Sequence, residues 1–199
     1  MARPRDAEKA RDLALRASAI LQEQGLGIST ERLAQLLDVK RPTLLYHFPT
    51  QTSIVEAALA ELFVEQAAFV ERKVGEHEHP IDRVYARMRA VHEFHRGQEA
   101  RLLFLTQSIA VSGGTRALEI LRGASDFFEP GRRAMVDGIE RGVAEGTVAP
   151  CDAKALVNLV RAVIDGLTIQ AVTSSRSVKP IHELVWKSVL EPLKIRRSS

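Results

Sequence analysis

Apolar side chains recur along this chain at the three- and four-residue spacing that places them on one face of an α-helix. No segment shows the sustained alternation of apolar and polar residues that is typical of β-strands. The pattern therefore predicts an all-α fold, in which Pro130 and Pro192 break or bend the helices that contain them. The predicted helices span about residues 6–24, 29–37, 40–48, 50–73, 80–96, 99–111, 114–145, 152–173 and 179–195.

Residues typical of helix ends mark the boundaries of the first four helices. Gly25 follows the first helix, and Ser29 precedes the second, where its hydroxyl can accept a hydrogen bond from a free backbone N–H. Pro42 falls in the first turn of the third helix, where its missing N–H does no harm. Thr50 or Thr52 can cap the fourth. These signals predict two short helices joined by a tight turn and flanked by longer ones.

The composition is that of a folded protein. Hydrophobic residues make up 45% of the 199 residues and charged residues 27%, which is too apolar for a disordered chain. The chain lacks the run of about 18 apolar residues that a membrane span needs, and its first residues are charged. The single cysteine, Cys151, cannot form an intrachain disulfide. We therefore expect a cytoplasmic protein without a secretory signal.

Charge is distributed unevenly. The formal net charge of +3 is too small to indicate a nucleic-acid partner by itself, so its distribution matters more. Residues 39–49 carry two cations and a histidine but no acid, whereas residues 50–79 carry six glutamates against two cations. Positive potential is therefore concentrated on the predicted third helix.

Two short helices that share a tight turn and follow a supporting helix form the pattern of a helix-turn-helix unit. In such a unit, the second helix presents its N-terminal and outward side chains to the major groove of DNA. Arginine and lysine reach guanine edges or phosphates, threonine contacts a thymine methyl, and tyrosine stacks on or donates to the backbone. Spacing alone leaves two interpretations open, DNA binding or a solvated charged surface. The outward positions are Lys40, Arg41, Thr43, Tyr46 and His47, whereas Leu44 and Leu45 point toward the protein.

Residues 28–59, ISTERLAQLLDVKRPTLLYHFPTQTSIVEAAL, resemble the DNA-binding segment of TetR-family transcriptional regulators. The resemblance implies that Thr30 and His47 bind phosphates and that Phe48 anchors the hairpin in its small core. It further implies that Lys40, Arg41, Thr43 and Tyr46 face bases or backbone. The features that agree in order and spacing are Ser29-Thr30, Leu33-Ala34, Val39, Pro42-Thr43-Leu44, His47-Phe48 and the apolar run from Ile54.

Three positions depart from the family pattern. Asp38 stands in the turn where the family usually has glycine, and aspartate adopts a left-handed conformation more readily than most residues, so we expect the turn to survive. Leu45 stands where the family usually has a phosphate-binding tyrosine, and Gln51 where it usually has a lysine. We therefore expect a weaker or redistributed grip on phosphate.

The resemblance also implies that the last two long helices of each subunit form a four-helix dimer interface. Each of these helices carries an apolar stripe, and the alternative is that both stripes complete the core of one subunit. We predict a homodimer. The stripes are Leu156, Leu159, Val160, Val163, Leu167 and Ala171 on the first helix, and Ile181, Leu184, Val185, Val189 and Leu193 on the second.

A ligand pocket, which the family's architecture implies, is expected among the middle helices, whose apolar faces carry a few polar groups. We expect it to take a small apolar or amphipathic molecule. The alternative is that these residues are plain core, with the histidines hydrogen-bonded at its edge. The candidate lining residues are Met88, His92, His95, Phe104, Gln107 and Phe127.

No catalytic constellation is recognisable in the sequence. Glu76 and His79 form a single Glu-x-x-His pair, which is too little for a metal site in a helical bundle, so we expect no metal and no cofactor. The prediction is a non-enzymatic, ligand-responsive repressor that binds a palindromic operator as a dimer. Its DNA-binding domain spans residues 1–49, and its ligand-binding and dimerisation domain spans 50–199. The alternatives are a DNA-binding regulator without a ligand and, more remotely, an all-helical enzyme.

Overall fold

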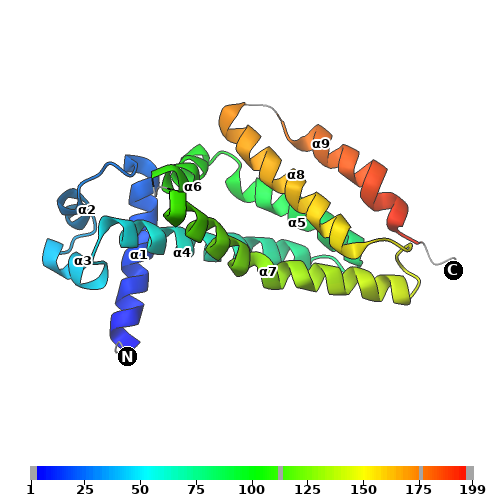
Figure 1. The fold of residues 1–199 in the computed structure, drawn as a ribbon, viewed down its shortest axis with the longest axis horizontal. Helices are drawn as coiled ribbons and strands as arrows, with labels where there is room; N and C mark the ends of the chain where they lie inside the picture. Colours follow the sequence, from blue (N-terminus) through cyan, green and yellow to red (C-terminus); the bar gives the residue numbers. More distant parts are fainter. Residues whose placement is uncertain (1–3, 112–113, 175–176, 196–199) are drawn as a thin grey trace. The chain divides into compact units, whose positions relative to one another are not determined.

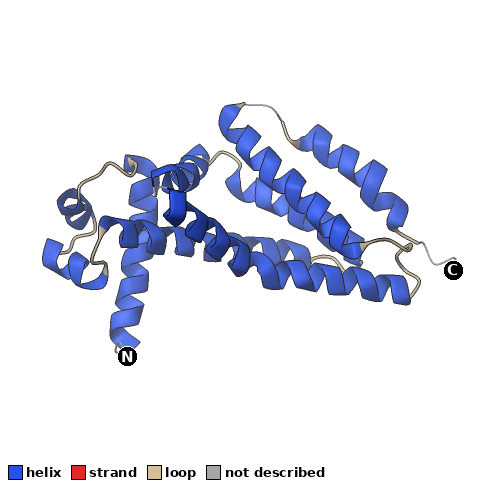
Figure 2. Cartoon of the chain, viewed as in Figure 1, coloured by secondary structure: helices blue, strands red, loops and turns tan. Residues whose placement is uncertain are grey.

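The computed structural model describes residues 4–111, 114–174 and 177–195. These residues form helices and connecting turns without a β-strand, which confirms the predicted all-α fold (Figures 1 and 2). None of the described helices combines the length and the hydropathy that crossing a membrane requires. The helices are α1 (Pro4–Gln24), α2 (Thr30–Leu36), α3 (Arg41–His47), α4 (Gln51–Gly75), α5 (Pro80–His95), α6 (Glu99–Val111), α7 (Gly114–Ala144), α8 (Ala153–Thr173) and α9 (Lys179–Val185).

The helix ends follow the local chemistry of the sequence. α1 is followed by Gly25, whose positive φ of 76° favours glycine. The Ser29 hydroxyl caps α2 by accepting from the backbone N–H of Arg32 at 3.1 Å. Thr50 and Ser53 cap α4 reciprocally, because each backbone N–H donates to the other hydroxyl at 3.1 Å. The capping roles predicted for Ser29 and Thr50 are therefore confirmed.

The two internal prolines behave differently from each other. α7 continues without interruption from Gly114 to Ala144 through Pro130, so a broken helix at this point is the wrong prediction. Proline removes only one of the hydrogen bonds of a 31-residue helix, and the turns on both sides remain helical. After α9 the winding changes first to a π-helical turn, Trp186–Leu190, and then to a 3₁₀ turn that contains Pro192. The last helix is thus irregular ahead of its proline.

The described residues cluster into two compact units. The first comprises residues up to Glu65 together with Gln98–Ser125, and the second comprises Gln66–Gly97 together with residues from Asp126 onward. The first unit thus contains α1, α2, α3 and α6 with the beginnings of α4 and α7. Because α6 packs on α1, this compact unit extends well beyond the predicted boundary at residue 49. The functional division at that residue stays a prediction.

Each unit has its own buried core. In the first, leucines of α1, α2 and α3 and apolar residues of α4 and α6 are buried, and α1 packs on α2 and α6. In the second, α5, α7, α8 and the last helical segments contribute to one cluster. The main members of the first core are Leu13, Leu21, Leu33, Leu37, Leu44, Ile54, Leu62 and Phe104, and those of the second are Ile81, Met88, Ile139, Val157, Val160 and Leu190.

Candidate nucleic-acid interface

The turn between α2 and α3 is closed by backbone hydrogen bonds. The N–H of Asp38 donates to the carbonyl of Gln35 at 3.1 Å, and that of Val39 donates to the carbonyl of Ala34 at 3.0 Å. Asp38 lies in the left-handed region with φ of 54°. The prediction that the turn survives without glycine is confirmed. Asp38 adopts the left-handed conformation there, which is less favourable for it than for glycine.

A side chain from α1 supports the same turn. The guanidinium of Arg16 donates to the carbonyl of Leu37, the C-terminal capping residue of α2, and also pairs with Asp12 at 3.5 Å. A cation at this place satisfies a free carbonyl and opposes the negative end of the helix dipole. The contact spans 21 residues of sequence, so helical periodicity gave no sign of it.

The inner face of α3 fixes its orientation in the first unit. Leu44 is fully buried, and Phe48, the residue that ends the helix, is buried as well. Leu33 and Leu37 of the preceding helix and turn are buried as well, and α2 packs on α3. Phe48 is therefore buried, as an anchoring role requires, while Leu45 is only half-buried.

The opposite face of α3 presents free polar groups. Lys40 and Arg41 are exposed at the start of the helix, and neither forms an ion pair with any described residue. Tyr46 is 71% exposed, and its ring meets that of His47 edge to face at a centroid distance of 5.1 Å. Thr43 and His47 are half-buried. The structure thus places these predicted residues on one short element, whose two cations form no ion pair within the described part of the chain.

Two further positions complete this region. Thr30 is the first residue of α2 and is half-buried. Gln51 has a role that the sequence did not reveal, because its side-chain amide donates to the carbonyls of Leu26 and Ile28, each at 2.9 Å. These bonds tie the loop between α1 and α2 to the first turn of α4. The departure from lysine at this position therefore supplies a structural contact.

The predicted ligand residues are divided between the units. Met88, His92 and His95 are buried in the second unit, and Phe127 of the same unit is 42% exposed. Phe104 and Gln107 belong to the first unit, where Phe104 is buried and Gln107 is exposed. The structure brings the first three onto one helix, α5, and does not gather all six around one cavity within either unit. Their roles in binding stay predictions.

The buried histidines form a hydrogen-bonded network. His92 Nε2 lies 3.2 Å from the carbonyl of Ile164, and His92 Nδ1 lies 2.8 Å from His182 Nε2. Because the carbonyl can only accept, a neutral His92 donates to it and accepts from His182. Burial, followed by the nearby positive charges of His92, Arg89 and Arg96, lowers the pKa of His182 to about 4. His182 was not singled out in the sequence because it lies 90 residues from its partner.

The predicted apolar stripe on α8 is split between two surroundings. Leu156, Val160 and Leu167 are buried in the second unit, so for these residues the alternative of a subunit core is correct. Leu159 is 46% exposed, and Ile169, one further residue of α8, is 62% exposed. The side chain of Ala171 lies outside the described residues.

Five exposed small or apolar residues of α8 form a face of their own. They follow one another at spacings of four, three, four and three residues, which places them on one side of the helix. On α9, which belongs to the same unit, Ile181 and Leu184 are exposed as well. An apolar surface is thus left on the two helices that were expected to mediate dimerisation. Its α8 members are Ala155, Leu159, Ala162, Gly166 and Ile169.

Known structures share this arrangement of helices. No protein-family model matches the sequence, and no curated protein matches it. A TetR transcription regulator from Haloarcula marismortui aligns with a TM-score of 0.76 at 14% identity, covering 94% of this chain and 100% of that one. A transcriptional regulator from Saccharomonospora viridis, solved in complex with choline, aligns with a TM-score of 0.68 at 17% identity, covering 96% and 100%. AibR, solved with isovaleryl coenzyme A and operator DNA, aligns with a TM-score of 0.54 at 15% identity, covering 78% and 83%. The chain therefore has the fold of TetR-family regulators, as the sequence led us to expect.

Proposed function

We propose that this protein is a ligand-responsive transcriptional repressor, which binds a two-fold-related operator as a homodimer and is released by a small-molecule inducer. The proposal rests on the outer face of α3, where Lys40 and Arg41 are exposed without an ion-pair partner among the described residues and Tyr46 is exposed further along the helix. A buried inner face and an unpaired cationic outer face suit a helix that enters the major groove.

The roles of the α3 residues follow from their chemistry. Arg41 stands at the first position of the helix, from which a guanidinium can reach a guanine edge in a bidentate manner. Lys40 precedes it and suits a phosphate, and the exposed phenol of Tyr46, five residues after Arg41, suits the DNA backbone. Thr30 at the start of α2 and the half-buried His47 complete the proposed set of phosphate contacts.

Dimerisation is supported by the exposed apolar face on α8 and α9. Gly166 lies in the middle of this face on α8, and a Cβ at that position would meet no atom within 4 Å, so a partner helix has room to approach. Glycine inside a helix costs about 1 kcal/mol relative to alanine, and close packing by a second subunit offsets this cost. A symmetric dimer would present two copies of α3 to two half-sites.

Response to a ligand is supported by what the neighbouring structures contain, since one holds choline and another holds isovaleryl coenzyme A together with operator DNA. For this chain we propose a small apolar or amphipathic inducer that binds in the second unit. Such an inducer releases the operator only if it binds the free conformation more tightly than the DNA-bound one.

Selection from random-sequence DNA, followed by mobility shift with the enriched sequence, tests this function. We expect enrichment of a two-fold-related site whose half-sites are separated by about one helical turn or more. Failure to enrich any sequence at low salt would contradict the proposal. Screening small molecules for loss of the shifted band then tests induction, and a band that no molecule releases would favour a regulator without a ligand.

A further inference from the structure

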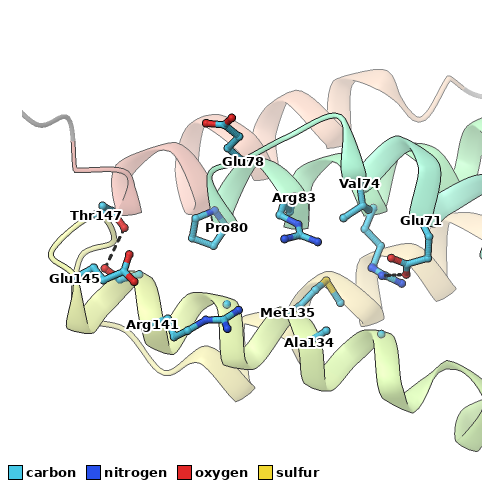
Figure 3. A pocket seen from close by; sticks show the side chains of 14 residues that line it. Glu71, Val74, Glu78, Pro80, Arg83, Ala134, Met135, Arg141, Glu145 and Thr147 are labelled. Atoms are coloured by element: carbon cyan, nitrogen blue, oxygen red, sulfur yellow. Dashed lines mark hydrogen bonds and ion pairs between the residues drawn. The ribbon is translucent and has the colours of Figure 1, made fainter.

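The second unit contains a cleft that none of the predicted ligand residues lines. It has a volume of about 170 Å³ and lies between the end of α4, the first half of α5 and the second half of α7 (Figure 3). An apolar cavity of about 150 Å³ holds a benzene molecule, so this cleft suits a ligand of roughly ten non-hydrogen atoms or fewer. That is smaller than the usual site for a drug-sized molecule.

Three arginines converge on this cleft. Arg83 and Arg87 stand one turn apart on α5, and Arg141 of α7 lines the same cleft, with Arg83 and Arg141 on facing helices in Figure 3. Arg83 and Arg141 are exposed and form no ion pair with any described residue. Two unpaired guanidinium groups facing one space suit a carboxylate or phosphate, each of which can accept paired hydrogen bonds from arginine.

Arg87 forms the buried part of the cationic set. Its side chain is 12% exposed and pairs with Glu71 at the end of α4. Its Nε atom is buried and finds no hydrogen-bond partner within the described structure. A buried donor without an acceptor is costly, so an oxyanion that reaches this atom would remove a penalty as well as add a contact.

Small residues on α7 keep the cleft open opposite these arginines. A Cβ at Gly131 would lie 2.9 Å from Arg87 Nη1, so glycine at this position leaves room for the guanidinium. A Cβ at Gly138 would meet only Pro80, at 3.8 Å, so the space in front of this glycine is free. Val74 and Met135 line the same cleft and give it an apolar portion (Figure 3).

The acidic residues of the cleft form no ion pair with Arg83 or Arg141 within the described structure. Glu71 is committed to Arg87, while Glu78 and Glu145 form no ion pair with any described residue. In Figure 3 the carboxylate of Glu78 is turned away from Arg83 and Arg141, and Glu145 lies beside Thr147 at one end. Apart from the Arg87–Glu71 pair, the lining thus holds two arginines and two glutamates, and the part between α5 and α7 is where Arg83 and Arg141 offer positive charge to a ligand.

We propose that this cleft binds a small organic anion, whose carboxylate or phosphate contacts Arg83, Arg87 and Arg141 and whose short apolar part lies against Val74 and Met135. As an inducer site the cleft rests on the proposed function, whereas the binding of the anion does not. The proposal narrows the expected apolar or amphipathic ligand to an anionic one and places it away from Met88, His92 and Phe104.

Methionine-methyl NMR tests this site directly, because the chain has only three methionines. Met135 lines the cleft, and Met88 is fully buried in the core of the same unit, where it serves as an internal reference. The full-length protein is titrated with benzoate and with phenyl phosphate, and in parallel with neutral benzamide and cationic benzylamine. We expect the two anions to shift the Met135 signal saturably while the Met88 signal stays in place.

Variants separate the cleft from the rest of the surface. Arg83→Gln combined with Arg141→Gln should weaken anion binding at least tenfold, since each removes a charge-assisted contact. Gly138→Leu should abolish binding by filling the cleft, and leucine favours a helix more than glycine does. Arg122→Gln combined with Arg133→Gln removes two exposed charges of α7 that do not line the cleft, and should leave binding unchanged.

These measurements test anion binding in the cleft separately from the proposed repressor function. A small anion in this cleft should bind with a Kd of about 1 mM or lower, so about 10 mM anion should nearly saturate it. A Met135 signal that neither anion moves at this concentration would overturn the proposed anion site. Equal shifts with benzamide or benzylamine, or binding that survives in Gly138→Leu, would overturn it too. Operator binding is measured on the same samples without anion, and its absence would contradict the proposed repressor while leaving a saturable Met135 shift intact.

Discussion

The buried pair of His92 and His182 predicts a specific dependence of stability on pH. Burial and neighbouring positive charge lower the pKa of His182 from 6.5 to about 4 in the folded protein, whereas the unfolded chain retains the ordinary value. Between these two values the unfolded state binds more protons. The contribution of neutral His182 to the free energy of unfolding should therefore be complete above pH 6.5. It should decrease as the pH falls toward 4.

The size of this effect follows from the shift. Lowering the pKa of His182 from 6.5 to about 4 corresponds to about 3 kcal/mol of the free energy of unfolding. This free energy changes by at most about 1.4 kcal/mol per pH unit for each proton. The pKa of His92 is also lowered, mainly because its ring is buried, and this acts in the same direction. Protonating the pair would in addition place two positive charges on rings whose nitrogens lie 2.8 Å apart.

Urea unfolding at a fixed protein concentration between pH 4.5 and 8 measures the effect. Trp186, the only tryptophan, reports it by fluorescence because its ring packs at a centroid distance of 4.7 Å from that of Tyr85. His182→Gln is the matched variant, since its amide can still donate to His92 but does not titrate. We expect a shallower acid slope in this variant. The same slope in both proteins would refute a neutral, buried His182 as the cause.

Three further predictions concern the dimer face, the α1–α2 loop and the turn. Leu159→Arg should yield a folded monomer in sedimentation, because the side chain of Leu159 is exposed. Leu167→Arg should instead unfold the protein, because it buries a charge. A Leu159→Arg variant that remains dimeric would contradict the interface. Gln51→Lys should steepen the slope of log affinity against log salt by about 0.9 per new phosphate contact. It should also lower the free energy of unfolding by about 1–2 kcal/mol, because the two hydrogen bonds of the Gln51 amide are lost. An unchanged slope would place this position away from the DNA backbone. Asp38→Gly should raise the free energy of unfolding by up to about 1 kcal/mol, since glycine adopts the observed φ of 54° without strain, and a lower melting temperature would count against this reasoning.

Local chemistry explains which parts of the fold were predictable. Ser29, Pro42 and Thr50 act within one helical turn of their own positions, so the sequence around them is sufficient to place the helix ends. The outer face of α3 was predictable for the same reason, because a seven-residue helix with a buried Leu44 leaves few alternatives for its charged positions.

Contacts between distant segments explain what was not predictable. Arg16 and Leu37, and likewise His92 and His182, meet only after the helices have packed, and no spacing in the sequence links them. The stripe on α8 mixed buried Leu167 with exposed Leu159, since both neighbouring faces of this helix are apolar. The arginine cleft was missed because its arginines lie on two helices, with more than fifty residues between those of α5 and Arg141 of α7.

The most direct test of the account compares wild type and Arg41→Ala on the operator obtained by selection and on its single-base variants. We expect Arg41→Ala to lose about 1–3 kcal/mol of binding free energy and to lose discrimination at one position of each half-site. Arg122→Ala, which removes an exposed arginine outside the helix-turn-helix, should bind like wild type. If Arg41→Ala binds the operator and all its variants as wild type does, α3 does not read DNA and the proposed function is wrong.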